Sequence, residues 1–118
     1  SKPGRSFTPD SPLAFPDTSL NKLYEICKSE YPDHLAVVQC GCFWEFYEDD
    51  ATKCNELFDW KIGRRHGLAV TGTSLDNVGI FDRLKKANEP FLVVSQSSYT
   101  DSAESGARVP RAVTEIWP

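Results

Sequence analysis

Two short apolar runs constrain the fold of this chain more than any other feature of its sequence. Residues 35–38 (LAVV) and 91–94 (FLVV) are each of strand length, and neither contains a polar side chain. Uninterrupted runs of this kind are typical of strands that are buried inside a sheet covered by helices. We therefore expect Leu35–Cys40 and Phe91–Ser95 to be the central strands of a sheet.

Segments with helical spacing alternate with these runs. Apolar residues recur three and four positions apart between residue 20 and Pro32, in residues 48–58 and from about residue 75 to 88, and Thr18 or Ser19 can cap the first helix. Residues 60–62 and 68–70 are short strand candidates, and residues 109–117 alternate like a strand with one solvated face, with Val113 and Trp117 on the same side. The expected fold class is therefore α/β, a mixed β-sheet flanked by helices. The third helix should turn Val78 inward, and the core should include Leu23, Ile26, Val37, Leu57, Phe81, Leu84 and Val93.

The first 19 residues differ from the rest. Their prolines fix φ and remove backbone donors, so we expect residues 1–19 to be an extended arm without regular structure and residues 20–118 to be the folded domain. Residues 97–108 are polar and rich in Gly and Ser, which predicts a flexible loop. The chain begins with Ser1 and contains no Met, so we expect a processed protein or a piece of a longer one.

Charge and composition exclude several classes of function. The net charge is −4 and the pI about 5.1, whereas an autonomous nucleic-acid binder usually carries a basic field. No apolar run approaches the roughly 20 residues that cross a bilayer, so membrane insertion is not expected. The sequence has no Gly-rich phosphate loop and no nucleophile with a base nearby, so we expect a non-catalytic protein without cofactors.

Four cysteines raise the question of a metal site. Cys27, Cys40, Cys42 and Cys54 lack the paired C-x-x-C spacing of zinc sites, and the two histidines are isolated. We expect no metal and four free thiols in a reducing intracellular compartment, with nucleus, mitochondrion and plastid left open.

Residues 41–47, G-C-F-W-E-F-Y, are the most informative segment. They follow the expected strand 35–40 and precede a helix that opens with Asp49-Asp50-Ala51. This order resembles the first domain of the MutS family of DNA repair proteins, in which a strand leads into G-D-F-Y-E-x-(F/Y) and then into a helix opening with D-D-A. Weaker similarities follow in the family's order at residues 57–59, 70–72, 93–96 and 111–118, so the resemblance covers about residues 20–118.

The resemblance implies the fold of MutS domain I and a mismatch-sensing DNA-binding module. Phe43 would be a wedge that unstacks a poorly paired step of double-stranded DNA, where deformation costs least. Glu45 would accept a hydrogen bond from a displaced base or be protonated beside it. Both side chains should then be accessible at a strand-to-helix turn. Arg64 and Arg65, in the basic turn Gly63–Gly67, are either phosphate contacts or an ordinary solvated turn.

Three departures from the family keep a second function open. Cys42 replaces the usual acid, the stretch 63–67 is shorter than the usual loop, and this chain lacks the clamp, lever and ATPase domains. The alternative is a MutS-type domain repurposed as a structural or docking subunit of a larger assembly, organellar and ribonucleoprotein assemblies included. The acidic pI favours the alternative, as would a domain that stands alone, and four aromatic residues in five positions also suit a core or a protein interface. Phe43 and Glu45 favour DNA binding.

Overall fold

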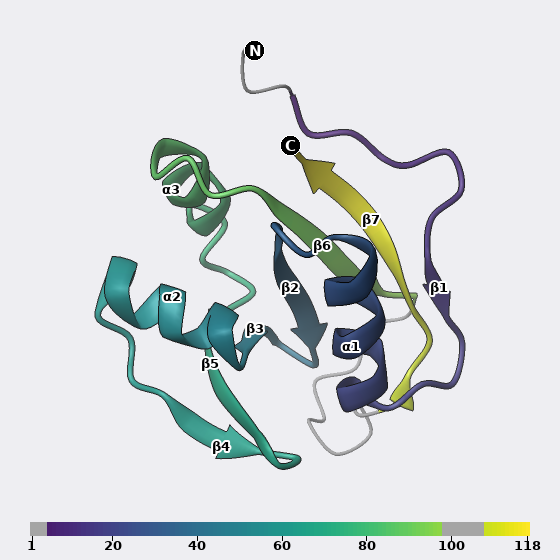
Figure 1. Ribbon diagram of the computed structural model, residues 1–118, viewed down its shortest axis with the longest axis horizontal. Coiled ribbons are helices and arrows are strands. Elements are labelled where there is room, and N and C mark those ends of the chain that lie inside the picture. Colours follow the sequence, from purple (N-terminus) through teal and green to yellow (C-terminus); the bar gives the residue numbers. More distant parts are fainter. Residues whose placement is uncertain (1–4, 98–107) are drawn as a thin grey trace.

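A seven-stranded mixed sheet organises the computed structural model, which describes residues 5–97 and 108–118 (Figure 1). The strand order is β1-β7-β6-β2-β3-β5-β4. The strands are β1 (Ala14–Phe15), β2 (Leu35–Cys40), β3 (Phe43–Tyr47), β4 (Gly63–Arg65), β5 (Leu68–Ser74), β6 (Phe91–Gln96) and β7 (Arg111–Trp117), and the helices are α1 (Leu20–Glu30), α2 (Asp49–Phe58) and α3 (Ile80–Lys86).

The two apolar runs form the centre of the sheet, as predicted. β2 and β6 pair in parallel from Leu35↔Phe91 to Val38↔Val94, and the other strand pairs are antiparallel. The predicted α/β class, a mixed sheet flanked by helices, is confirmed. Because β2 and β6 are covered on both faces, their side chains divide between two separate cores.

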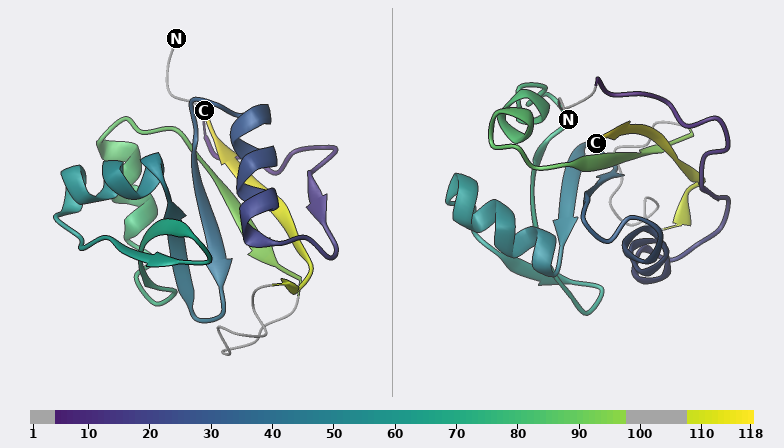
Figure 2. Two further views of the ribbon diagram at one scale, coloured as in Figure 1. Left: turned by 60° about the horizontal axis from the view of Figure 1, so that its bottom comes forward. Right: turned by 45° about the horizontal axis from the view of Figure 1, so that its top comes forward.

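Helices lie against both faces of the sheet (Figure 2). Each face has its own hydrophobic cluster. The α1-side core joins Leu20, Leu23 and Cys27 of α1 to the alternate residues of the central strands that point toward that helix. The α2/α3-side core joins Cys54, Ile80 and Leu84 to the residues that point the other way. Ser19 caps α1, because its hydroxyl accepts a hydrogen bond from the Lys22 N–H.

Four of the seven predicted core residues are buried. These are Leu23, Val37, Leu84 and Val93. Ile26 and Phe81 are half-buried at the edges of the two clusters. Leu57, by contrast, is 36% exposed, so its predicted burial is wrong. It lies in the last turn of α2, where Cys54 and Phe58 cover the sheet instead.

The third helix begins five residues later than predicted. Residues 75–79 form a connection in which the Leu75 N–H donates to the Cys42 carbonyl and the Asn77 side chain donates to the Thr73 hydroxyl, 3.0 Å away. These hydrogen bonds hold residues 75–79 outside the helix, which therefore begins at Ile80. Val78 is consequently 74% exposed, and its predicted inward orientation is wrong.

The basic stretch predicted to be a turn is largely a strand. Gly63–Arg65 pairs with Leu68–Val70 around a two-residue turn in which His66 and Gly67 have φ of 56° and 77°. Positive φ at both loop residues is the requirement of the type I′ hairpin turn. The hairpin displaces the predicted strand 60–62 to 63–65, and β5 extends to Ser74.

Part of the proline-rich arm is also strand. Ala14 and Phe15 pair with β7, and Phe7 bridges to Ile116, so the described part of the arm lies along the sheet edge. No proline interrupts these pairings. Phe15 is only 3% exposed. Pro3 and most of the predicted loop 97–108 lie outside the described residues.

A bulge alters the predicted faces of the last strand. Val93 pairs with Glu115 whereas Val94 pairs with Val113, so Thr114 is an extra residue on β7. As a result Val113 packs in the α1-side core and Trp117 in the α2/α3-side core. The prediction that they share a face is wrong for this reason.

A buried carboxylate joins three elements. Asp50, at the start of α2, accepts a hydrogen bond from the Ala36 N–H at 3.0 Å and pairs with Lys28 of α1 at 3.0 Å. Burial raises the pKa of the Asp50 carboxyl, and these two contacts oppose the rise. The buried charge is therefore tolerated only while both partners remain.

The variant Asp50→Ala should lose about 3 kcal/mol of unfolding free energy, because it leaves the Ala36 N–H without its acceptor and the part-buried Lys28 ammonium without its counter-ion. Its exposed neighbour Asp49 is the matched control, and Asp49→Ala should cost no more than about 1 kcal/mol through the helix dipole. Urea denaturation measures both, and equal losses would contradict this role of Asp50.

Candidate nucleic-acid interface

A tight hairpin turn presents the aromatic segment. Gly41 and Cys42 connect β2 to β3, with Cys40 opposite Phe43. Gly41 has a φ of 61°, and a positive φ at the first loop position is what a type II′ turn requires. Phe43 thus follows a strand-to-strand turn. The predicted strand-to-helix turn is wrong, because the aromatic segment itself forms β3 before α2 begins.

Side chains of neighbouring strands fix this turn in place. The Gly41 N–H donates to the Gln96 side chain at 2.8 Å, and the Gln96 N–H donates to the Gln39 side chain at 2.9 Å. Buried Arg111 donates from Nε to the Gln39 carbonyl at 2.9 Å. With the bond from Leu75 N–H to the Cys42 carbonyl, the turn is tied to β6, β7 and the connection after β5. The hydrogen bonds therefore hold the tip of the β2–β3 hairpin, next to Phe43, in one conformation.

Phe43 is exposed although it is a large apolar residue. Its exposed fraction is 43%, whereas Phe46 in the same strand is fully buried. Alternate residues of a strand share a face, so Phe43, Glu45 and Tyr47 lie on the α1 side of β3. The predicted exposure of Phe43 agrees with the structure.

Glu45 is buried, contrary to the predicted accessibility. It is only 5% exposed, and both carboxylate oxygens are engaged. The Tyr47 hydroxyl donates to Oε1 at 2.7 Å, and the Arg65 guanidinium forms an ion pair with Oε2. Burial raises the pKa of Tyr47, so its hydroxyl keeps the proton that it donates. The short β4–β5 hairpin brings Arg65 over β3, which buries the carboxylate.

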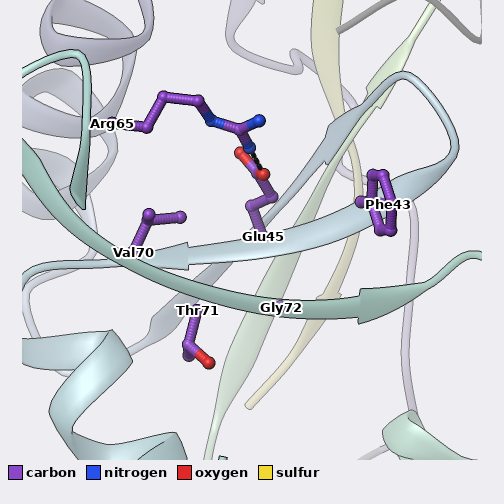
Figure 3. Close-up of a pocket in the computed structure, with 6 residues that line it drawn as sticks. All are labelled: Phe43, Glu45, Arg65, Val70, Thr71 and Gly72. Carbon is purple, nitrogen blue, oxygen red and sulfur yellow. Dashed lines mark ion pairs between the residues drawn. The ribbon is translucent and has the colours of Figure 1, made fainter. Parts of the chain in front are cut away.

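Phe43, Glu45 and Arg65 border one open pocket of about 230 Å³ (Figure 3). Figure 3 shows Arg65 reaching from the β4–β5 hairpin to Glu45, with Phe43 farther along the same strand. Arg64 precedes Arg65 in β4 and therefore points to the opposite face. It is exposed and donates to the Gly67 carbonyl at 2.9 Å. The structure thus brings Arg65 to the predicted site residues and separates Arg64 from them.

Gly72 completes the pocket. It lies opposite Glu45 on β5, and a Cβ at this position would come within 2.5 Å of the Trp44 carbonyl oxygen. The missing side chain lets the backbones of β5 and β3 approach closely beside the ion pair.

The described part of the chain contains no cluster of three or more metal-ligating side chains. All four cysteines are described and carry free thiols, and burial raises the pKa of Cys27 and Cys54 to about 12. Among the described helices, none has the length and apolar character needed to span a membrane.

The sequence model of MutS domain I matches residues 18–117. The chain belongs to the MutS domain I family. It is a MutS-like mismatch-recognition domain by family. The predicted resemblance, which residues 41–51 carry most specifically, is confirmed.

The contacts that hold the site residues of this MutS domain are not visible in its sequence. Phe43, Glu45 and Arg65 are each predicted as site residues, but the pairing of Glu45 with Arg65 is not predicted. Tyr47 was also missed, although a residue two positions after Glu45 in a strand must share its face. The pairing with Arg65 depends on the register of the β4–β5 hairpin, which no local pattern reveals.

The variant Gly72→Ala should lose about 1–3 kcal/mol of unfolding free energy, because the added methyl collides with backbone rather than with a flexible side chain. Gly63→Ala on the adjacent strand is the control, since a Cβ there meets nothing within 4 Å. Thermal or urea denaturation compares the two, and a Gly72→Ala protein as stable as Gly63→Ala would refute the close approach.

Proposed function

We propose that this MutS-type domain binds double-stranded DNA and inserts Phe43 at poorly paired steps, without catalysing a reaction. The observation that carries the proposal is the 43% exposure of Phe43 at the end of a fixed hairpin, in a chain of the MutS domain I family. Exposed aromatic or aliphatic side chains can unstack a base step from the minor groove and kink the duplex.

The fixed hairpin supports a wedge role energetically. Unstacking a step costs a few kcal/mol, and the cost is lower where pairing is already poor. A mobile Phe would also lose conformational freedom on insertion. Phe43 starts from a turn that is hydrogen-bonded to β6 and to the connection after β5, so little further ordering is needed.

The charge distribution supports weak binding by this chain alone. Arg64 is exposed and suited to a phosphate contact, and Arg65 lies beside the wedge. With a net charge of −4, few phosphates can be neutralised, and we expect dissociation constants of about 10⁻⁴ to 10⁻⁶ M. In a MutS-like protein, other domains or subunits would supply the remaining phosphate contacts.

The variant Phe43→Ala should abolish the preference for mismatched over matched duplex and leave stability almost unchanged, because the side chain is exposed. Fluorescence anisotropy with the two duplexes measures the preference. Phe7→Ala is the matched control: Phe7 is 49% exposed but lies beside β7, which β6 and β2 separate from β3.

Two outcomes would overturn the proposal. If Phe43→Ala costs the roughly 3–5 kcal/mol typical of a core Phe, the side chain packs rather than wedges. If the unaltered protein binds neither duplex at low salt and co-purifies with a large complex, the docking-subunit function replaces DNA binding.

A further inference from the structure

We propose that Arg65 is the polar group that this domain presents to DNA beside the wedge, and that Glu45 is its positioning residue. The inference rests on the proposed function, because it assigns roles within the same site. It reverses the roles that the family resemblance alone implies, in which Glu45 itself meets the displaced base.

The contacts of Glu45 are those of an anchor. One carboxylate oxygen accepts from the Tyr47 hydroxyl at 2.7 Å and the other is paired with Arg65, and only 5% of the residue is exposed. A DNA base could reach the carboxylate only by displacing one of these partners. Displacement would leave a buried charge or a buried hydroxyl without its partner, which is costly.

Arg65 has the exposure and the donors that Glu45 lacks. Its side chain is 33% exposed and borders the same pocket as Phe43. A guanidinium carries five N–H donors, more than one ion pair uses. Its Nε is buried and has no hydrogen-bond partner among the described residues. The surrounding protein therefore does not satisfy every donor of this guanidinium. Donors left over on the exposed side are available to an incoming acceptor.

The charge of the pair suits a polyanionic ligand. A bare carboxylate beside Phe43 would repel DNA phosphates, and pairing with Arg65 removes that repulsion. Glu45 and Tyr47 also hold the long Arg65 side chain in one place, so less rotamer entropy is lost on binding. A positioned guanidinium next to an inserted apolar residue suits the minor groove, whose negative potential attracts Arg.

The acceptor on DNA is a nitrogen or oxygen atom within reach of Phe43. Base edges in the minor groove and phosphate oxygens both present such atoms. They are distinguishable, because a base-edge contact changes the preference for a mismatch whereas a phosphate contact changes affinity for every duplex.

The test compares charge-conserving variants by anisotropy with matched and mismatched duplexes. Arg65→Lys keeps the positive charge that neutralises Glu45 but loses the planar fork of donors. We expect it to weaken mismatch binding about tenfold, within the range of one good arginine contact. Arg83→Lys is the matched control and should change binding less than about twofold, because Arg83 is exposed on α3, which covers the other face of the sheet. Circular dichroism and urea denaturation establish that each variant is folded.

Glu45→Gln distinguishes a positioning role of Glu45 from a repulsive one. If Glu45 only repels DNA, removal of its negative charge beside the wedge tightens binding. If Glu45 positions Arg65, the variant weakens mismatch binding by a factor similar to that of Arg65→Lys. Because both substitutions disable the same contact, Glu45→Gln with Arg65→Lys should be no worse than either alone. Loss confined to mismatched duplex identifies a base edge as the acceptor, and equal loss on both duplexes identifies a phosphate.

Three results would overturn the inference. They are wild-type binding by Arg65→Lys, tighter binding by Glu45→Gln, and additive losses in the double variant, which would mean that Glu45 meets the DNA independently. If Phe43→Ala removes the mismatch preference while Arg65→Lys does not weaken binding, the inference fails and the wedge stands. If Phe43→Ala leaves that preference intact, the proposed function fails, and the roles assigned to Arg65 and Glu45 fail with it.

Discussion

The parallel pairing of β2 with β6 is the constraint on which the rest of the structure depends. Neither strand has a face that tolerates water, so helices must cover both sides of the sheet. That requirement places α1 on one side and α2 and α3 on the other, and it splits the core into two clusters. It also anchors the β2–β3 turn, because Gln39 and Gln96 at the ends of these strands hold Gly41 in place.

Features set by local pattern could be predicted from the sequence. The apolar runs at residues 35–38 and 91–94 located the central strands, and the two capping candidates Thr18 and Ser19 located the start of α1. Features set by contacts between distant segments could not. The connection at residues 75–79 is fixed by the Cys42 carbonyl rather than by helical spacing, and the bulge at Thr114 shifts the faces of β7 without a local signal.

The candidate site shows the same division. Phe43 could be named because the segment 41–47 resembles MutS domain I, and its exposure was expected from the wedge role that this resemblance implies. The state of Glu45 could not be predicted, because its burial results from an arginine twenty residues later in a separate hairpin. The ion pair neutralises the Glu45 carboxylate, and we propose that the Arg65 guanidinium is the group offered to a ligand in its place.

Insertion of Phe43 into the duplex at a poorly paired step can be measured directly. The measurement is the fluorescence of 2-aminopurine placed next to a mismatch, since this base is quenched while stacked and brightens when unstacked. We expect saturating protein to raise the fluorescence, Phe7→Ala to do the same, and Phe43→Ala at equal occupancy to leave it unchanged. An equal rise with Phe43→Ala, or no rise with the unaltered protein at saturation, would contradict this insertion.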